Sequence, residues 1–113
     1  MHEYAIVAEL VRQVESEARR AGAAAVTRVT VAIGDLSGVE RGLLATAYDV
    51  FRGRTVCETA ELSLRAVPAV WSCPGCARDV APGAVLSCPD CVVPARLRQG
   101  DEIVLERIEM EVA

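Results

Sequence analysis

The chain has 113 residues, of which 52% are hydrophobic and only 4% aromatic, so its length and composition suit one compact domain with an aliphatic core. The formal net charge of −4 argues against nucleic-acid binding, because phosphate recognition needs a concentrated basic surface. No segment approaches the roughly 20 apolar residues of a membrane helix, and charged residues interrupt the apolar pattern at the N-terminus. We therefore expect a cytoplasmic protein with no membrane partner.

The first predicted element is an amphipathic helix from Tyr4 to Ala21. Gly22 directly after it is a plausible stop signal, because glycine readily adopts the left-handed conformation that ends many helices. The apolar residues recur at helical spacing, with charged residues on the other faces, at Val7, Leu10, Val11, Val14, Ala18 and Ala21.

A half-buried strand and a second helix follow. Residues 27–34 alternate between apolar and polar side chains, which predicts a strand with Val29, Val31 and Ile33 toward the core. The run from Ser37 to Glu40 has the form of a capping box, so we expect a helix that begins there and reaches about Arg52. Its predicted inward side chains are Leu43, Leu44, Ala47, Tyr48 and Phe51.

Two further strands are predicted at residues 60–67 and 102–112. Leu62 and Leu64 share one face of the first of these strands. In the last strand the alternation changes phase at Glu106 and Arg107, which indicates a β-bulge. Two helices on one face of a three-stranded sheet would bury all of these apolar residues.

Between the last two strands lies a segment rich in cysteine, proline and glycine. Cys73 and Cys76 form one C-x-x-C pair, and Cys88 and Cys91 form a second pair after eleven intervening residues. Four thiolates at one point make the tetrahedral site that structural zinc prefers, and a complete set of sulfur ligands argues against a catalytic zinc. Because the segment has almost no apolar core, metal binding would supply its folding free energy.

The same pattern leaves alternatives open. Rubredoxin-like iron uses the same ligands, and free thiols or two disulfides are further options. A thiol oxidoreductase would need Cys73 and Cys76 as an exposed pair of low pKa. The fifth cysteine, Cys57, is interpreted as a buried structural residue.

We therefore predict an α+β fold, with two helices on a three-stranded sheet and an inserted zinc-ribbon-like minidomain. The main domain would comprise residues 1–68 and 97–113, and the minidomain residues 69–96.

The N-terminus Met1-His2-Glu3 offers a second metal site. The α-amine of Met1, the backbone nitrogen of His2 and its imidazole Nδ1 can close two adjacent chelate rings, and Glu3 could supply a fourth donor. Such planar nitrogen and oxygen donors suit Ni(II) or Cu(II) rather than zinc. A solvated terminal histidine is the alternative interpretation.

The chain resembles the HypA/HybF family of nickel metallochaperones, which act in NiFe-hydrogenase maturation. The resemblance spans the chain and rests on four features in order: the Met1-His2-Glu3 opening, the run Ile33-Gly34-Asp35-Leu36-Ser37-Gly38-Val39-Glu40, the paired cysteines, and the closing segment from Gly100 to Val112. Family members usually carry glycine after each cysteine pair, where this chain has Ala77 and Val92. A left-handed valine is costly, so we expect a less regular second knuckle or a more mobile minidomain, with zinc retained.

The resemblance implies nickel binding by Met1, His2 and Glu3 as cargo, and structural zinc binding by Cys73, Cys76, Cys88 and Cys91. It also implies two partners, the nickel-handling maturation GTPase and the hydrogenase large-subunit precursor, and no enzymatic activity. Some family members also serve urease, and a homodimer is a further expectation. The rival hypothesis is a zinc-ribbon interaction adaptor without nickel transfer.

Overall fold

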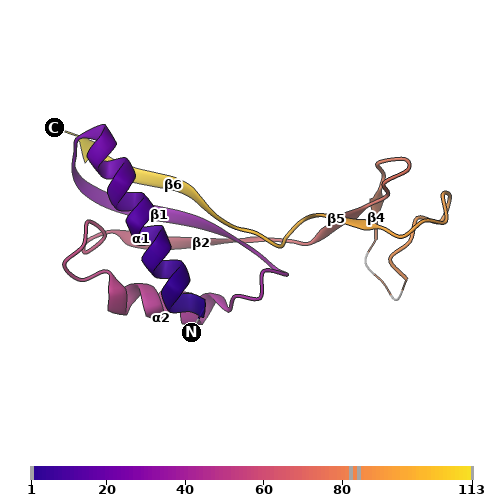
Figure 1. Ribbon diagram of the computed structural model, residues 1–113, viewed down its shortest axis with the longest axis horizontal. Helices are drawn as coiled ribbons and strands as arrows, with labels where there is room; N and C mark the ends of the chain where they lie inside the picture. Colours follow the sequence, from indigo (N-terminus) through magenta and orange to yellow (C-terminus); the bar gives the residue numbers. More distant parts are fainter. Residues whose placement is uncertain (1, 82, 84, 113) are drawn as a thin grey trace.

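The computed structural model describes residues 2–81, 83 and 85–112, and residue 2 by its backbone alone. Figure 1 shows an elongated molecule in which a body of helices and long strands is joined to a smaller sheet. The principal extents are 56 × 29 × 16 Å. Neither helix in the described part of the chain is long and apolar enough to cross a membrane.

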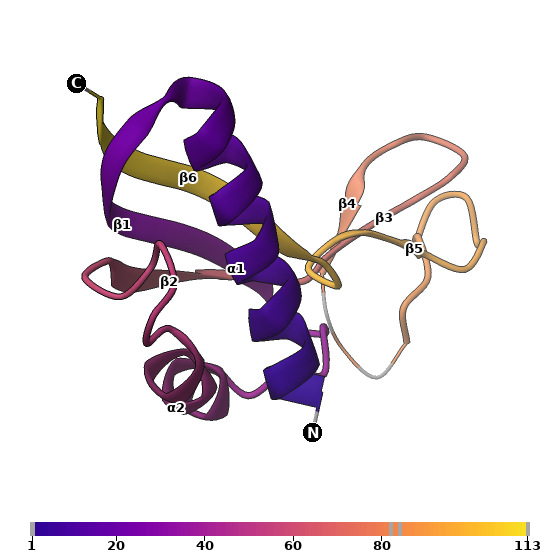
Figure 2. The same ribbon diagram turned by 60° about the vertical axis from the view of Figure 1, so that its left-hand side comes forward.

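The body is a three-stranded sheet covered on one face by two helices, which confirms the predicted α+β fold. Helix α1 (His2–Ala21) leads through Gly22 into β1 (Ala23–Gly34), the central strand. Strand β1 pairs in parallel with β2 (Glu61–Val67) and antiparallel with β6 (Ile103–Val112), giving the order β2-β1-β6. Helix α1 and α2 (Arg41–Phe51) lie on the same side of this sheet (Figure 2).

The core lies between the helices and the sheet. The predicted apolar face of α1 is buried there from Val7 to Ala18, whereas Ala21 at the end of the helix is exposed. Val29, Val31 and Ile33 of β1 are each at most 2% exposed. Strand β1 begins four residues before the predicted strand, because its alanine-rich start at Ala23 pairs with the end of β6 at Val112. Long-range pairing here overrides a local composition that has no strand signal.

The predicted capping box at Ser37 is wrong. Glu40 is the residue that caps α2, and its carboxylate accepts hydrogen bonds from the amides of Gly42 at 2.9 Å and Leu43 at 2.7 Å. The Ser37 hydroxyl instead accepts from the amide of Val39 at 3.3 Å. Gly38 has a φ of 80°, outside the helical region, so the helix cannot begin at Ser37.

The predicted inward face of α2 is correct at three positions and wrong at two. Leu44, Ala47 and Tyr48 are buried, whereas Leu43 is 56% exposed and Phe51 is 39% exposed. Leu43 is turned about 100° from its neighbour Leu44 and so lies off the buried face, and Phe51 is the last residue of the helix.

The predicted bulge in β6 is confirmed. Thr30 pairs with Arg107 and Val31 pairs with Leu105, so Glu106 is the additional residue on the β6 side. The bulge keeps apolar residues toward the core on both sides of the phase change, at Ile103, Leu105, Ile108 and Met110.

The smaller sheet consists of β3 (Val70–Ser72), β4 (Asp79–Val80) and β5 (Arg96–Gln99), in the order β4-β3-β5. At the junction of the two sheets, the amide of Leu36 donates to the carbonyl of Gly100 at 2.7 Å. Gly100 has a φ of 109°, and a Cβ there would lie 2.5 Å from the Cα of Ala69. Only glycine fits this crossing. The division of the chain into domains at residues 69 and 96 stays a prediction.

Candidate metal centre

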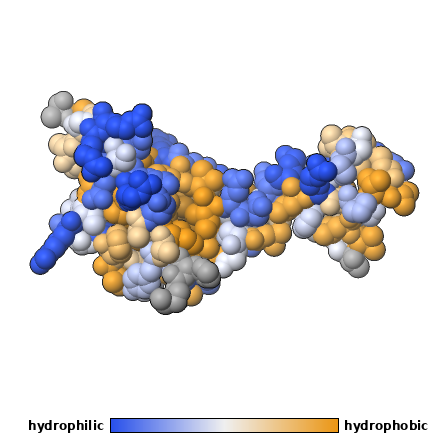
Figure 3. All heavy atoms as spheres, in the orientation of Figure 1, coloured by the Kyte–Doolittle hydropathy of each residue, from blue (hydrophilic) through white to orange (hydrophobic). Residues whose placement is uncertain are grey.

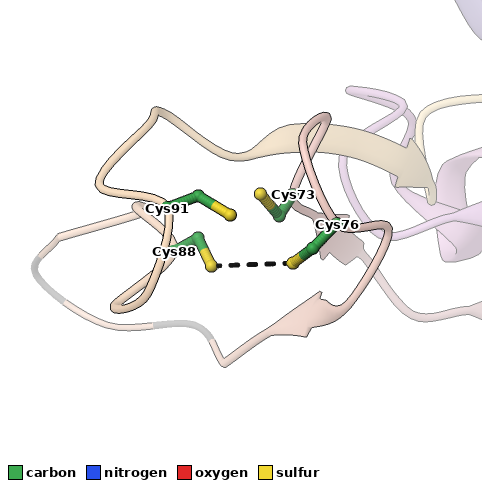
Figure 4. A group of neighbouring side chains, drawn as sticks. All are labelled: Cys73, Cys76, Cys88 and Cys91. Carbon is green, nitrogen blue, oxygen red and sulfur yellow. Dashed lines mark hydrogen bonds between the residues drawn. The ribbon is translucent and has the colours of Figure 1, made fainter.

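The four cysteines of the two C-x-x-C pairs converge on one point, as Figure 4 shows. Cys73 directly follows β3, Cys76 lies three residues on, and Cys88 and Cys91 come from the opposite loop. Their sulfur atoms all lie within 4.8 Å of one another, and the Sγ atoms of Cys76 and Cys88 are 3.9 Å apart. A tetrahedral zinc with Zn–S bonds of about 2.3 Å separates its ligands by about 3.8 Å, so this donor set fits such an ion.

Both cysteine pairs have the same backbone structure. The amide of Ala77 donates to the carbonyl of Cys73 at 2.8 Å, and the amide of Val92 donates to the carbonyl of Cys88 at 2.9 Å. Each turn needs a left-handed residue after its second cysteine, and φ is 63° at Ala77 and 52° at Val92. The expected irregularity of the second knuckle is therefore not observed. Instead Val92 holds a backbone conformation that a β-branched residue rarely adopts.

The thiols are unequal because they are crowded together. Burial of Cys73 opposes ionisation, but hydrogen bonds from the amides of Cys76 and Gly75 and from the thiols of Cys76 and Cys91 together outweigh it and lower the pKa of this thiol to about 7. Neighbouring Cys73 and Cys76 raise the pKa of Cys91 to about 12. The thiolate of Cys73 is thus stabilised by hydrogen bonds, whereas ionisation of Cys91 would place a second negative charge beside the first. Holding all four as thiolates requires a cation among them.

An ion pair joins the two halves of the site. Arg78 Nη1 lies 2.6 Å from Asp90 Oδ2. Arg78 follows the first cysteine pair and Asp90 lies within the second pair, so this ion pair connects the two turns. Asp90 raises the pKa of Arg78, and the thiolates of Cys76 and Cys88 contribute in the same direction. A guanidinium beside the sulfurs offsets part of the negative charge that four thiolates bring. Sequence reasoning missed this pair, although opposite charges next to the two cysteine motifs were a usable signal.

The module around these cysteines has a very small apolar core. Its buried cluster consists of Cys73, Val80 and Cys88, with Trp71, Val93 and Ala95 packed against it. Two of the three buried residues in the described part of the module are therefore sulfur donors themselves. Such a cluster cannot order some thirty residues by apolar burial alone, so metal binding would have to supply the difference.

The predicted nickel residues lie at the start of α1. Met1 and the side chain of His2 lie outside the described residues, and Glu3 is half-buried in the first helical turn. His2 is the first residue of α1, and the first amides of a helix have no carbonyl partner within the helix. The backbone nitrogen that the proposed chelate needs is therefore not used by the helix.

Cys57 does not belong to either site. Its side chain is fully buried in the main core, as expected for a structural cysteine, and burial raises the pKa of its thiol. The neighbouring Tyr48 hydroxyl donates to the carbonyl of Ala60 at 2.9 Å and ties α2 to the loop that carries Cys57. A protonated, inaccessible thiol is suited to packing rather than to chemistry.

The fold and the site define a class of protein: a small α+β body with an attached four-thiol metal module. A family model described as "Hydrogenase/urease nickel incorporation, metallochaperone, hypA" matches residues 1–110. The hydrogenase maturation factor HypA of Shewanella baltica (strain OS185) is 38% identical over 113 residues, covering 98% of this chain and 97% of that protein. The one from Wolinella succinogenes is 39% identical over 114 residues, covering 98% and 96%.

Solved structures agree in fold. The solution structure of the Ni metallochaperone HypA from Helicobacter pylori has a TM-score of 0.75 at 29% identity, with 98% of each chain covered. A second solution structure of a HypA protein has a TM-score of 0.83 at 30% identity, covering all of this chain and 98% of the other. The chain belongs to the HypA family of nickel metallochaperones for hydrogenase maturation, proteins that carry metal and are not enzymes.

Proposed function

We propose that this chain binds Ni(II) at its N-terminus and delivers it to the large-subunit precursor of a NiFe-hydrogenase. The ligands would be the Met1 amine, the His2 backbone nitrogen and imidazole, and a donor from Glu3. The observation that carries this proposal is the Met1-His2-Glu3 opening in a chain of the HypA family, with His2 as the first residue of α1. The helix leaves that amide unpaired, so nickel does not compete with a helical hydrogen bond.

Transfer of the metal fits a site of this kind. A chelate on a chain terminus can be approached from several directions, and its nitrogen donors exchange protons for metal. Delivery would take place by contact with the precursor and with the nickel-handling maturation GTPase, in the cytoplasm. Nickel is cargo here, whereas the second metal would be a resident part of the fold.

We assign the resident metal as zinc, held by Cys73, Cys76, Cys88 and Cys91. The proposal is supported by the sulfur separations, which match a tetrahedral ion, and by four sulfur donors that leave no open coordination position. In this role zinc contributes charge compensation and folding free energy. Two further residues of the chain would help to stabilise the thiolates. The Gly75 amide donates a hydrogen bond to the Cys73 sulfur at 3.3 Å, and the Arg78 guanidinium adds a positive charge nearby.

The test is a nickel titration by calorimetry on three zinc-loaded proteins. The untagged chain should bind nickel, while a chain with a long N-terminal extension and the variant His2→Ala should not. The extension converts the Met1 amine to an amide, and the substitution removes the imidazole. Lowering the pH should release nickel, because protons compete for the same nitrogens.

Zinc content serves as the control and should be equal in all three proteins, since neither change touches the cysteines. Equal nickel affinity in all three would exclude the N-terminal site. Zinc binding with no nickel binding in the untagged chain would favour the interaction adaptor without nickel transfer.

A further inference from the structure

The sheet of the body has an unpaired edge at β2. In the order β2-β1-β6, strand β2 has no neighbour on its outer side among the described residues. Its solvent-facing side chains are Glu61, Ser63 and Arg65, and the intervening Leu62 and Leu64 pack against the core. An exposed edge of this kind can pair with another strand unless the sequence prevents it.

The sequence of β2 is complementary to itself when reversed. An antiparallel pair centred on Ser63 sets Glu61 opposite Arg65 at two symmetric positions, and Leu62 opposite Leu64 at two more. Residues that lie directly opposite each other across two paired strands point to the same face of the sheet. An alternative register is therefore possible only if it keeps Glu61 on the solvent face. Registers centred on Leu62 or Leu64 lose both charge pairs, and one centred on Arg65 opposes two arginines.

The charges on the solvent face extend this complementarity across the sheet. Glu61 lies 2.9 Å from Arg28 of β1, which lies 3.7 Å from Glu109 of β6. Further along β2, beyond the row of Ser63 and Thr30, Arg65 Nε lies 2.9 Å from Glu106 Oε1. Pairing around Ser63 would place Glu61 of one copy beside Arg65 of the second copy. The charged side chains would then form one line across both sheets in which negative and positive charges alternate. The line runs from Glu109, Arg28 and Glu61 of one copy to Arg65 and Glu106 of the second.

The edge is accessible where the pairing needs it. The side chain of Glu61 is 73% exposed and that of Arg65 is 55% exposed. A groove runs between Ala45 and Asp49 of α2 and the stretch from Glu61 to Ser63, so the helix stands beside this part of the strand and leaves an open channel. The other sheet edge, β6, is interrupted by the bulge at Glu106, which makes it a less regular partner.

We propose that two copies of this chain associate through β2, antiparallel and centred on Ser63, to form one six-stranded sheet. A strand of seven residues buries less than the roughly 800 Å² per partner of a stable interface, so the dimer dissociates on dilution. The four-cysteine module begins at β3, shortly after β2 ends at Val67, and extends away from the body (Figure 1).

Charge exchange tests the register. Sedimentation of the zinc-loaded full chain over a wide concentration range should show a monomer–dimer equilibrium. Glu61→Arg or Arg65→Glu alone opposes like charges at both symmetric positions and should weaken association roughly tenfold. The double variant Glu61→Arg with Arg65→Glu restores opposite charges and should recover most of the affinity. Glu111→Arg on β6 is the matched control and should leave association unchanged.

A cross-link tests the centre of the pair independently of charge. Ser63 faces its own copy in this register, so Ser63→Cys should give a disulfide-linked dimer with oxidised glutathione. Thr30→Cys on the central strand cannot reach a second copy and should not. The proposal is overturned by a chain that stays monomeric at every concentration, by reversals that do not weaken the dimer, or by equal cross-linking of the two cysteine variants.

Discussion

The helix-covered sheet and the four-cysteine module differ in what holds each of them together. Among the described residues, the body buries one continuous cluster of fourteen, all but one aliphatic, cysteine or alanine. Among the described residues, the module buries three, and two of those are cysteines of the four-sulfur cluster. In the space-filling view of Figure 3, the body is the broader part of the molecule and the module is a narrower extension. Apolar burial suffices for the first region, while the second depends on its sulfur atoms.

Residues with positive φ occur in both regions: Arg54 in the body, Gly100 at the junction, and Ala77 and Val92 in the module. At the junction with the body, the left-handed residue is a glycine, Gly100, whose missing Cβ makes the conformation inexpensive. In the module, Ala77 and Val92 hold the same kind of conformation with a Cβ present. Because each of their amides completes a cysteine turn, metal binding can stabilise a conformation that the residue itself disfavours.

The largest effect should come from removing one sulfur. Cys88→Ser should abolish tight zinc binding and unfold the module, because metal binding provides of order 10 kcal/mol in small zinc modules. The body should remain folded, since its core contains none of these cysteines. Metal analysis and amide hydrogen exchange measure the two results separately. Cys57→Ser is the control for zinc content, and full zinc occupancy in Cys88→Ser would refute the four-sulfur site.

A buried charge should break the body instead. Val31 is fully buried at the centre of β1, so Val31→Asp places a carboxylate among aliphatic side chains with no partner. We expect a loss of about 3–5 kcal/mol in the free energy of unfolding, measured by urea denaturation. Thr30→Asp, on the solvent face of the same strand, should cost less than about 1 kcal/mol. Similar losses for the two variants would mean that the buried face is misassigned.

The smallest effect has the opposite sign and concerns strain in the module. Val92 is 79% exposed, so Val92→Gly removes little packing while it relieves the left-handed valine. We expect the zinc-bound module to gain about 1 kcal/mol, seen as slower zinc loss to a chelator. Val85→Gly is the matched control, because Val85 is 74% exposed and is not among the described residues with positive φ. Faster zinc loss in Val92→Gly would show that the valine side chain itself supports the site.

Sequence reasoning succeeded where the signal was local and repeated. The helical spacing of apolar residues predicted α1 and its end at Gly22, and the phase change at Glu106 predicted the bulge in β6. It failed where a single residue decided the outcome. The left-handed Gly38 prevents a helix from starting at Ser37, and α2 begins at Arg41.

For the site, residue spacing was sufficient to group the four cysteines, because two short turns bring their sulfurs together whatever surrounds them. The ion pair between Arg78 and Asp90 was not predictable in the same way, since it depends on how one turn lies against the other. The complementary edge of β2 likewise becomes visible only once the order of the strands is known.

By itself the sequence determined the element types of the body, the cysteine cluster and the resemblance to nickel metallochaperones, because these depend on periodicity and on spacing along the chain. The smaller sheet of β3, β4 and β5 was not predicted. The tertiary structure alone decided that β1 extends back to Ala23, that Glu40 caps α2, and that β2 is left at an edge. Those features depend on which segments meet in space. Contacts between residues far apart in the chain contribute as much free energy as local preferences do, and no local pattern records them.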